Sequence, residues 1–197
     1  MVTIINQLKT DQLKLSKKGT HNLVFFDTTS TTKQLQITLS NSDTQLNLFL
    51  FIFTKDKTAS KIKLQTLLTA PNTKSQAFIY QLCQGQSSSQ VDAIATITKD
   101  ATNSETYLTS NSLLLSEKCS AKVTPSLEIE NKQVKASHSS SIGNLDKEKL
   151  FYLTSRGLDQ KSAKQILIES FLKENLHHIN NDQKVLNKIN KHLSSHA

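Results

Sequence analysis

The sequence has 197 residues and a formal net charge of +8, with 36% hydrophobic and 20% charged residues. This length is enough for one domain with an appendage and for a buried core. The lysines are spread along the chain and interleaved with acids, without a dense basic run, which argues against a nucleic-acid-binding face. Two cysteines, Cys83 and Cys119, exclude a disulfide framework and favour a reducing compartment.

The N-terminal residues lack the basic start and long apolar core of a signal peptide. The most hydrophobic segment, residues 46–53, has well under half the length that a membrane-spanning helix needs. A short run of consecutive apolar residues instead predicts a strand buried on both faces. We therefore expect a cytoplasmic protein that does not associate with a membrane.

Short β-prone segments separated by polar turns fill the chain from about residue 13 to residue 143. Most have apolar residues at every second position, which is typical of a half-buried strand. The predicted strands are residues 35–39, 46–53, 62–64, 78–82, 91–97, 113–115, 127–129 and 134–138. Polar connectors predict turns at residues 40–44, 85–90 and 141–144. Strand spacing is irregular, without a strict repeat, so it does not choose between a sandwich, a barrel and a solenoid.

After Gly143 the pattern becomes helical; before it, only residues 2–15 have a spacing that a helix could share. Asp146 is placed to cap a first helix, with Leu150, Phe151, Tyr152 and Leu153 as its apolar residues, and Gly157 to end it. Asp159 caps a second helix, whose predicted apolar stripe is Ala163, Ile166, Leu167, Phe171 and Leu172. A third helix begins near Asp182, with inner residues Val185, Leu186, Ile189 and Leu193.

The chain therefore divides near residue 144. We expect a mainly β body over residues 1–144, with a short lead-in over residues 1–15, and a C-terminal helical domain over residues 145–197. Short helices gain most of their stability from packing. The helical domain must therefore pack on the β body, on a second chain, or on both.

No catalytic motif is present in the sequence: it has no glycine-rich phosphate loop, nucleophile elbow or metalloprotease helix. Spacing does not test for a Ser/His/Asp triad, because such residues converge only in three dimensions. His138 shares its strand face with Val134 and Ala136, and Cys119 lies at a comparable point after another strand. A thiolate and an imidazole on neighbouring strands could bind a soft metal or an iron–sulfur species. The simpler interpretation is a buried structural cysteine and a strand-end histidine.

Arg156 is the only arginine in the chain, which otherwise uses lysine for positive charge. A guanidinium presents a planar fork of donors that an ammonium lacks. One arginine among so many lysines suggests that geometry matters at this position, although a solvated arginine retained by chance fits as well.

Residues 150–158, Leu-Phe-Tyr-Leu-Thr-Ser-Arg-Gly-Leu, with Ala163 and Phe171 downstream, resemble the C-terminal signature of the SufB/SufD family of iron–sulfur cluster assembly proteins. The resemblance continues upstream in order and covers about residues 91–176. It includes Asn-Ser-Leu-Leu-Leu-Ser-Glu-Lys-Cys-Ser-Ala at residues 111–121 and the segment that ends in Ser137-His138. The SufD branch is more similar than the SufB branch in this last segment and in residues 150–157.

The resemblance implies a right-handed parallel β-helix (solenoid) body with a C-terminal α-helical domain, and so selects the solenoid. It implies a non-catalytic, SufD-like scaffold that pairs edge to edge with a SufB-like subunit and docks the SufC ATPase through its helices. A transient iron–sulfur cluster is then expected at the subunit interface, without a tightly bound cofactor in the isolated chain. The alternatives are a β-solenoid that only self-associates, as a homodimer, and a polysaccharide-acting β-helix enzyme, for which no acidic pair is obvious.

The resemblance also assigns residues. It places His138 on the SufD-type histidine of the nascent-cluster site, and Cys119 on a stretch similar to the Arg-Cys-Gly-Ala of SufB. It implies a partner-binding surface formed by Leu150, Phe151, Tyr152, Arg156, Gly157 and Phe171. The chain departs from the family in its length, which implies a shortened N-terminal part, and in Ser139-Ser140-Ser141, where the family has Gly-Ala-Thr.

Overall fold

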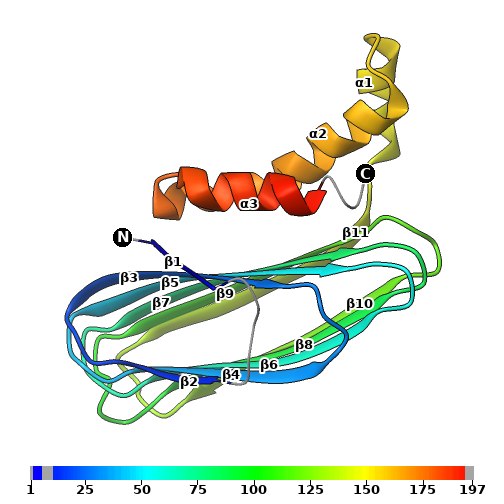
Figure 1. The fold of residues 1–197 in the computed structure, drawn as a ribbon. Coiled ribbons are helices and arrows are strands. Elements are labelled where there is room, and N and C mark those ends of the chain that lie inside the picture. Colours follow the sequence, from blue (N-terminus) through cyan, green and yellow to red (C-terminus); the bar gives the residue numbers. More distant parts are fainter. Residues whose placement is uncertain (1, 6–10, 194–197) are drawn as a thin grey trace.

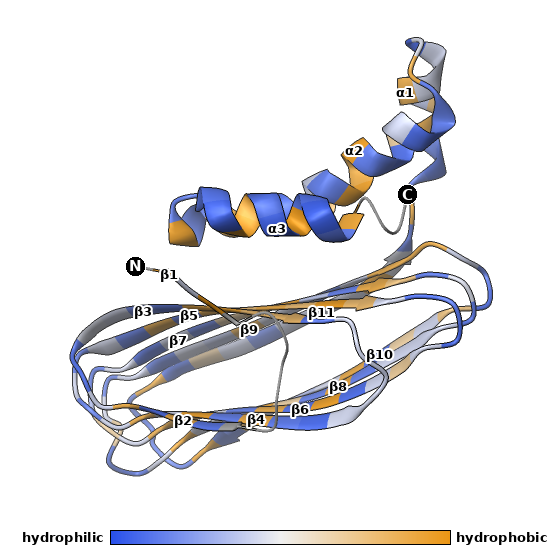
Figure 2. Cartoon of the chain, viewed as in Figure 1, coloured by the Kyte–Doolittle hydropathy of each residue, from blue (hydrophilic) through white to orange (hydrophobic). Residues whose placement is uncertain are grey.

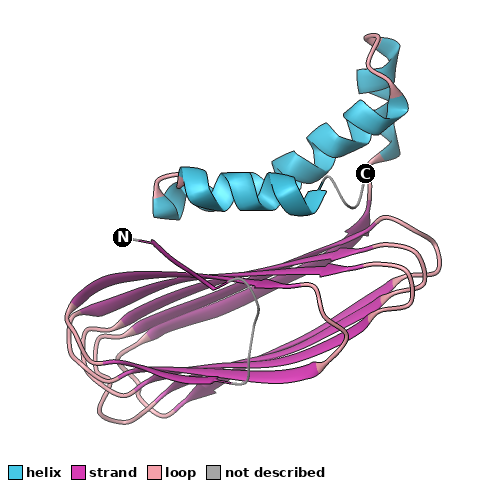
Figure 3. Cartoon of the chain, in the orientation of Figure 1, coloured by secondary structure: helices cyan, strands magenta, loops and turns pink. Residues whose placement is uncertain are grey.

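The computed structural model describes residues 2–5 and 11–193 (Figures 1 and 3). The strands are β1 (Val2–Ile5), β2 (Asp11–Leu15), β3 (Gly19–Asp27), β4 (Thr32–Leu39), β5 (Thr44–Thr54), β6 (Ala59–Leu68), β7 (Lys74–Cys83), β8 (Ser88–Ile97), β9 (Glu105–Leu114), β10 (Ser120–Ile129) and β11 (Lys135–Asn144). The helices are α1 (Lys147–Ser155), α2 (Gln160–Lys173), the 3-10 helix η1 (Leu176–Ile179) and α3 (Gln183–Leu193).

The strands form two facing parallel sheets. Odd-numbered strands make sheet A, in the order β1-β3-β5-β7-β9-β11, and even-numbered strands make sheet B, in the order β10-β8-β6-β4-β2. The chain thus crosses from one sheet to the other after each strand and advances by one coil at each return, for about four turns. The predicted parallel β-solenoid is confirmed.

From β4 and β5 onward, in-register residues of successive coils are 29 to 32 residues apart, as in the pairs Gln45 with Lys74 and Ser88 with Ser120. The N-terminal coils are shorter, because Gly19 pairs with Thr44 and Asp11 with Leu35.

Three successive coils carry a residue with positive φ at the same corner: Asp43 (58°), Asn72 (55°) and Asn103 (56°). Asp and Asn tolerate this left-handed conformation better than other residues with a side chain. Each is followed by a fully buried hydroxyl residue, respectively Thr44, Thr73 and Ser104. These corners fix the stacking of the coils.

Residues 46–53 show how the two apolar layers are built. In β5, Leu48, Leu50 and Ile52 point into the space between the sheets, where they join the solenoid core. The alternate residues Phe49, Phe51 and Phe53 point outward from sheet A and are also buried. The prediction of a strand buried on both faces is confirmed, and Figure 2 shows the hydrophobic and hydrophilic positions interleaved along the strands.

The second apolar layer lies between sheet A and the C-terminal helices. Its helical side comes from α2, η1 and α3, with Ile168, Leu172, Leu176, Ile179, Val185, Ile189 and Leu193. Figure 1 shows α3 lying along sheet A while α1 stands clear of both sheets. The expected packing of the helical domain on the β body is therefore confirmed for α2 and α3.

Three details of the sequence interpretation were wrong. Residues 2–5 and 11–15 form β1 and β2, not helix, because they pair with β3 and β4 at the end of the solenoid. Residues 141–144 belong to β11, where the parallel partner β9 supplies the hydrogen bonds that a turn would have satisfied. Ile166 is 44% exposed, and Ile168 takes its place on the buried stripe of α2.

Strands give way to helices between Asn144 and Lys147. Because sheet A and the helices share an apolar layer, the division into domains at residue 144 stays a prediction. Within the described residues, we find no helix with the length and apolarity to cross a bilayer.

Candidate functional site

The last coil leaves one end of the solenoid open. Strands β10 and β11 are the outermost strands of sheets B and A at this end. Two large apolar side chains are exposed there: Ile129 by 40% and Ile142 by 48%. Their register partners in the preceding coil, Ile97 and Ser112, are buried. Ile129 and Ile142 are therefore inward-facing positions that no further coil covers.

His138 lies in the middle of β11, at this open end. It is in register with Leu108, an almost fully buried residue of the solenoid core. In-register residues of parallel strands point to the same face of a sheet. The imidazole of His138 thus belongs to the core-facing row of β11, but it is exposed because no coil follows.

Cys119 lies in the turn between β9 and β10 and is 7% exposed. Its Sγ donates to the carbonyl oxygens of Ser116, at 3.0 Å, and Cys83, at 3.2 Å. Cys83 is fully buried one coil earlier, and this burial raises the pKa of its thiol to about 11. At neutral pH, Cys83 is therefore a protonated core residue.

The structure does not bring Cys119 and His138 together. Cys119 lines the same groove as Asn144, the last residue of β11. His138 lies in the middle of that strand, which separates it from Asn144 by about 20 Å at the rise of a β-strand. Among the residues that the structure describes, no group of three or more His, Cys, Asp or Glu side chains could hold a metal ion.

Helix α1 is well capped but unburied. The carboxylate of Asp146 accepts hydrogen bonds from the backbone N–H groups of Glu148 and Lys149, both at 3.0 Å, and the Lys149 bond is the main reason that the pKa of Asp146 is lowered. At the other end, Gly157 has φ of 92°, a conformation that glycine adopts freely. None of the residues of α1 is buried. The predicted start and end of this helix are confirmed.

The residues assigned to partner binding divide into two groups. Phe151 is 74% exposed and Tyr152 57% exposed, and the Arg156 guanidinium lies 5.4 Å from the centre of the Tyr152 ring. These three residues form an aromatic, cationic surface on α1, which Figure 2 shows standing away from the sheets. Leu150 is half-buried beside a groove, while Phe171 packs edge-on against Tyr80, with ring centres 5.5 Å apart.

Sequence reasoning missed Ile129 and Ile142 as surface residues. Alternation over residues 127–130 marked Ile129 as core-facing and was correct about the direction in which it points, whereas Ile142 was placed in a predicted turn. The available signal was that no strand follows residues 134–144 before the helices begin, so that the last coil has an uncovered face.

Comparison with known families identifies this architecture. The SufBD core domain of the SUF system of FeS cluster assembly matches residues 4–171. The chain belongs to the SufB/SufD family. The SufD proteins of Escherichia coli and Plasmodium falciparum are 31% identical over 109 residues and 38% identical over 92 residues. A SufBD family protein of Mycobacterium leprae is 38% identical over 76 residues. This family member is SufD-like.

The similarity covers only part of each relative. The matched segments take in 54%, 43% and 38% of this chain but 26%, 6% and 19% of the E. coli, P. falciparum and M. leprae proteins. Family membership therefore links the chain to iron–sulfur cluster assembly, although the chain spans well under half the length of these relatives.

Proposed function

We propose that the chain is a non-catalytic scaffold subunit of iron–sulfur cluster assembly, which pairs with a SufB-like subunit and docks a SufC-type ATPase. Pairing would occur at the open end of the solenoid, and docking on the exposed surface of α1. The proposal places the protein in the cytoplasm, where the two free thiols, Cys83 and Cys119, would stay reduced.

The observation that carries the pairing proposal is the uncovered last coil. Among the described residues, 2–5 and 11–193, strands β10 and β11 each have one edge without a partner strand. An edge of this kind is a template for strand addition by another chain. Ile129 and Ile142 flank the open core and would lose their exposed apolar area to a partner. The end of a second solenoid could both pair with the free edges of β10 and β11 and cover the exposed apolar side chains.

The docking proposal is supported by Phe151, Tyr152 and Arg156. Aromatic and arginine side chains are enriched among the residues that dominate binding energy at protein interfaces. Phe151 and Tyr152 make no buried contact within the chain, since they are 74% and 57% exposed. Gly157 would act by ending α1 at the correct place. Leu150 and Phe171 would act by packing beneath helices α1 and α2, on the side that faces the solenoid.

The iron–sulfur cluster enters this proposal as cargo. His138 offers an imidazole nitrogen on the face that a SufB-like partner would cover, and one imidazole needs further ligands from that partner. Cys119 donates its S–H to two carbonyl oxygens and faces a different groove. We therefore propose His138 as the ligand at the paired interface, and Cys119 as a second thiol that a rearrangement of its turn would have to release.

Co-expression with a SufB-like and a SufC-type subunit tests the scaffold proposal. The tagged chain is expected to retain both partners through size-exclusion chromatography. Ile142→Lys should reduce retention of the SufB-like subunit by about tenfold or more, because it places a charge in a desolvated interface. Gln34→Lys, which adds the same charge to an exposed position of β4, is the matched control. A folded chain that retains neither partner would overturn the proposal.

The same uncovered end supports a second candidate, self-association without a cluster role. Two copies could pair through β10 and β11, since each supplies the same open edges. Sedimentation of the isolated chain measures this directly. Adding the SufB-like subunit distinguishes the two candidates. A scaffold subunit would leave its homodimer to form a heterodimer with the SufB-like subunit, whereas a self-associating module would remain a homodimer.

A further inference from the structure

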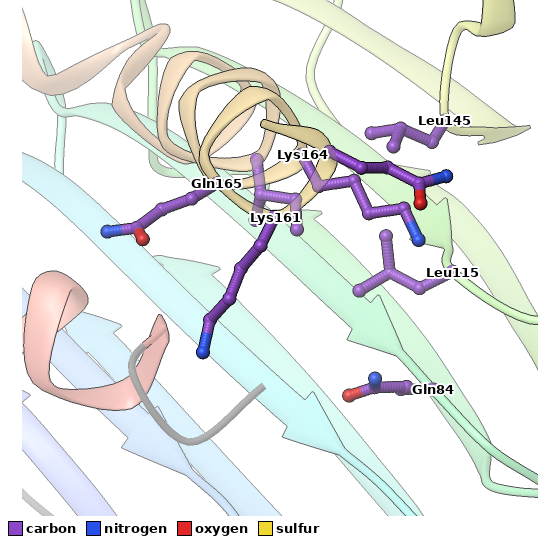
Figure 4. A pocket seen from close by; sticks show the side chains of 8 residues that line it. Gln84, Leu115, Leu145, Lys161, Lys164 and Gln165 are labelled. Carbon is purple, nitrogen blue, oxygen red and sulfur yellow. The ribbon is translucent and has the colours of Figure 1, made fainter. Parts of the chain in front are cut away.

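Two adjoining pockets lie between the first turns of α2 and the last coil of the solenoid. Their volumes are about 270 and 620 Å³, and Leu115, Leu145, Gln160 and Lys164 line both. We call the two together the α2 groove. Figure 4 shows Lys161 and Lys164 extending from α2, with Leu115, Leu145 and Gln84 also lining the smaller pocket.

The α2 groove carries uncompensated positive charge. Lys161 and Lys164 line the smaller pocket, whose lining contains no carboxylate. Lys147 lines the larger pocket, with Glu117 as its one acidic residue. None of these three lysines forms an ion pair within the described part of the chain. Lys161 and Lys164 are three residues apart on α2, a spacing at which like charges mildly destabilise a helix.

The groove also has an apolar side and a set of neutral hydrogen-bonding groups. Leu115, Leu145 and Ile168 supply the apolar surface of the smaller pocket, and the side-chain amides of Gln84 and Gln160 lie at its lining. Small-molecule sites are typically concave, mostly apolar and of roughly 300–1,000 Å³, with a few polar groups that orient the ligand. The α2 groove combines these properties with the ammonium group of Lys164, which lines both pockets and extends toward Leu115 and Leu145, whereas Lys161 extends in another direction (Figure 4).

We propose that the α2 groove binds a small organic anion, with its phosphate or carboxylate on the ammonium group of Lys164 and its apolar body against Leu115 and Leu145. Lysine serves as a point-charge partner for phosphate. The groove adjoins the proposed docking surface, because Leu150 lines the larger pocket, but Phe151, Tyr152, Ile129 and Ile142 line neither pocket. Ligand binding here would brace the α1–α2 hairpin against the last coil.

Affinity labelling with pyridoxal phosphate tests the site, because this probe has a phosphate, an apolar ring and an aldehyde that forms an imine with lysine. After borohydride reduction, peptide mapping of the full chain is expected to find Lys164 labelled first at substoichiometric probe. Lys188 is an internal reference: burial lowers its pKa, which favours labelling, but it lies in α3, outside the groove.

Competition identifies the ligand chemistry. Naphthyl phosphate is expected to protect Lys164 by about tenfold while leaving Lys188 unchanged. Naphthoate and inorganic phosphate, used in parallel, show whether a carboxylate suffices and whether the apolar body is needed. Labelling of all exposed lysines at similar rates, without protection by any of the three anions, would overturn the proposal.

Charge-matched variants provide the second measurement. Lys161→Gln with Lys164→Gln should lower the affinity for naphthyl phosphate, measured by calorimetry, by at least about tenfold. Lys61→Gln with Lys63→Gln removes the same charge from the exposed face of β6 and should leave the affinity unchanged. Equal losses in both double variants would mean that the anion responds only to net charge, which would contradict a defined site.

Discussion

Helices α1 and α3 are of similar length but differ in what their apolar residues do. The 9-residue α1 buries none of its residues, whereas the 11-residue α3 buries Val185, Ile189 and Leu193. Their sequences already differ. The apolar residues of α1 are four consecutive positions, residues 150–153, which spread around the helix, whereas Val185, Ile189 and Leu193 of α3 recur every four residues on one face. The comparison shows that a helix is buried along its length only where its apolar residues form one stripe and an apolar surface lies opposite.

That surface changes along sheet A. One in-register row of outward-facing residues runs Phe26, Phe51, Tyr80, Asn111 and Ser141 from β3 to β11. The first three are buried aromatic residues that stack at 5.2 and 5.3 Å, and the last two are polar. The C-terminal helices cover this aromatic part of the sheet: His192 of α3 stacks on Phe26, and Phe171 of α2 packs edge-on against Tyr80. The polar part gives α1 nothing to pack on, so that its aromatic residues stay exposed.

The largest effect is expected from Phe51→Ala. Phe51 is fully buried between Phe26 and Tyr80, so its truncation opens a cavity under the helices. We expect the free energy of unfolding to fall by about 3–5 kcal/mol, as measured by denaturant unfolding. A loss below about 1 kcal/mol would show that α3 is not held by the aromatic row, and would break the comparison with α1.

An intermediate effect, of a different kind, is expected from Phe151→Ala. Because the side chain is 74% exposed, the free energy of unfolding should change by less than about 0.5 kcal/mol. Binding of a SufC-type ATPase should weaken by about 2 kcal/mol, the scale of an interface hot spot. Circular dichroism and a binding titration separate the two quantities. Lost helicity with intact binding would mean that Phe151 serves packing instead of recognition.

The smallest effect is expected from pH. His178 stacks on Phe78, with ring centres 4.9 Å apart, and burial, followed by the charges of His177 and Lys74, lowers its pKa below the usual value of about 6.5. The unfolded chain therefore takes up this proton at higher pH than the folded chain. Stability should be complete above pH of about 6.5 and decrease as pH falls through the folded pKa.

Thermal unfolding at a series of pH values measures this decrease. His178→Phe keeps a ring on Phe78 and removes the titrating group, so its stability should depend less on pH over the same range. An identical pH dependence in the variant and the parent chain would assign the effect to another group.

Much of the fold could be predicted from local pattern. Alternation located eight strands, and the caps Asp146 and Asp159 with Gly157 located the first two helices, because these signals act within a few residues. Strand β3 and the full strand lengths were missed, because parallel pairing with neighbouring coils extends a strand beyond its apolar residues. The repeat was also missed: it lies in the corners at Asp43, Asn72 and Asn103, not in the strands.

The candidate site was less predictable. Sequence similarity pointed to Phe151, Tyr152 and Arg156, and only the structure could show that sheet A offers them no apolar surface. The relation between Cys119 and His138 depends on how coils stack, which spacing along the chain does not reveal. The α2 groove joins residues from α2 and from the turns of the solenoid, and no local pattern connects these segments.

Because translation proceeds from the N-terminus, the aromatic row of sheet A is made well before the helices that bury it. Phe26, Phe51 and Tyr80 leave the ribosome early, and the helices α2 and α3, which cover this part of sheet A, are made last. A nascent chain that stops before Gln160 would thus expose this aromatic row to solvent, and such a chain aggregates readily. Protection of this row until the helices are made is a task for chaperones.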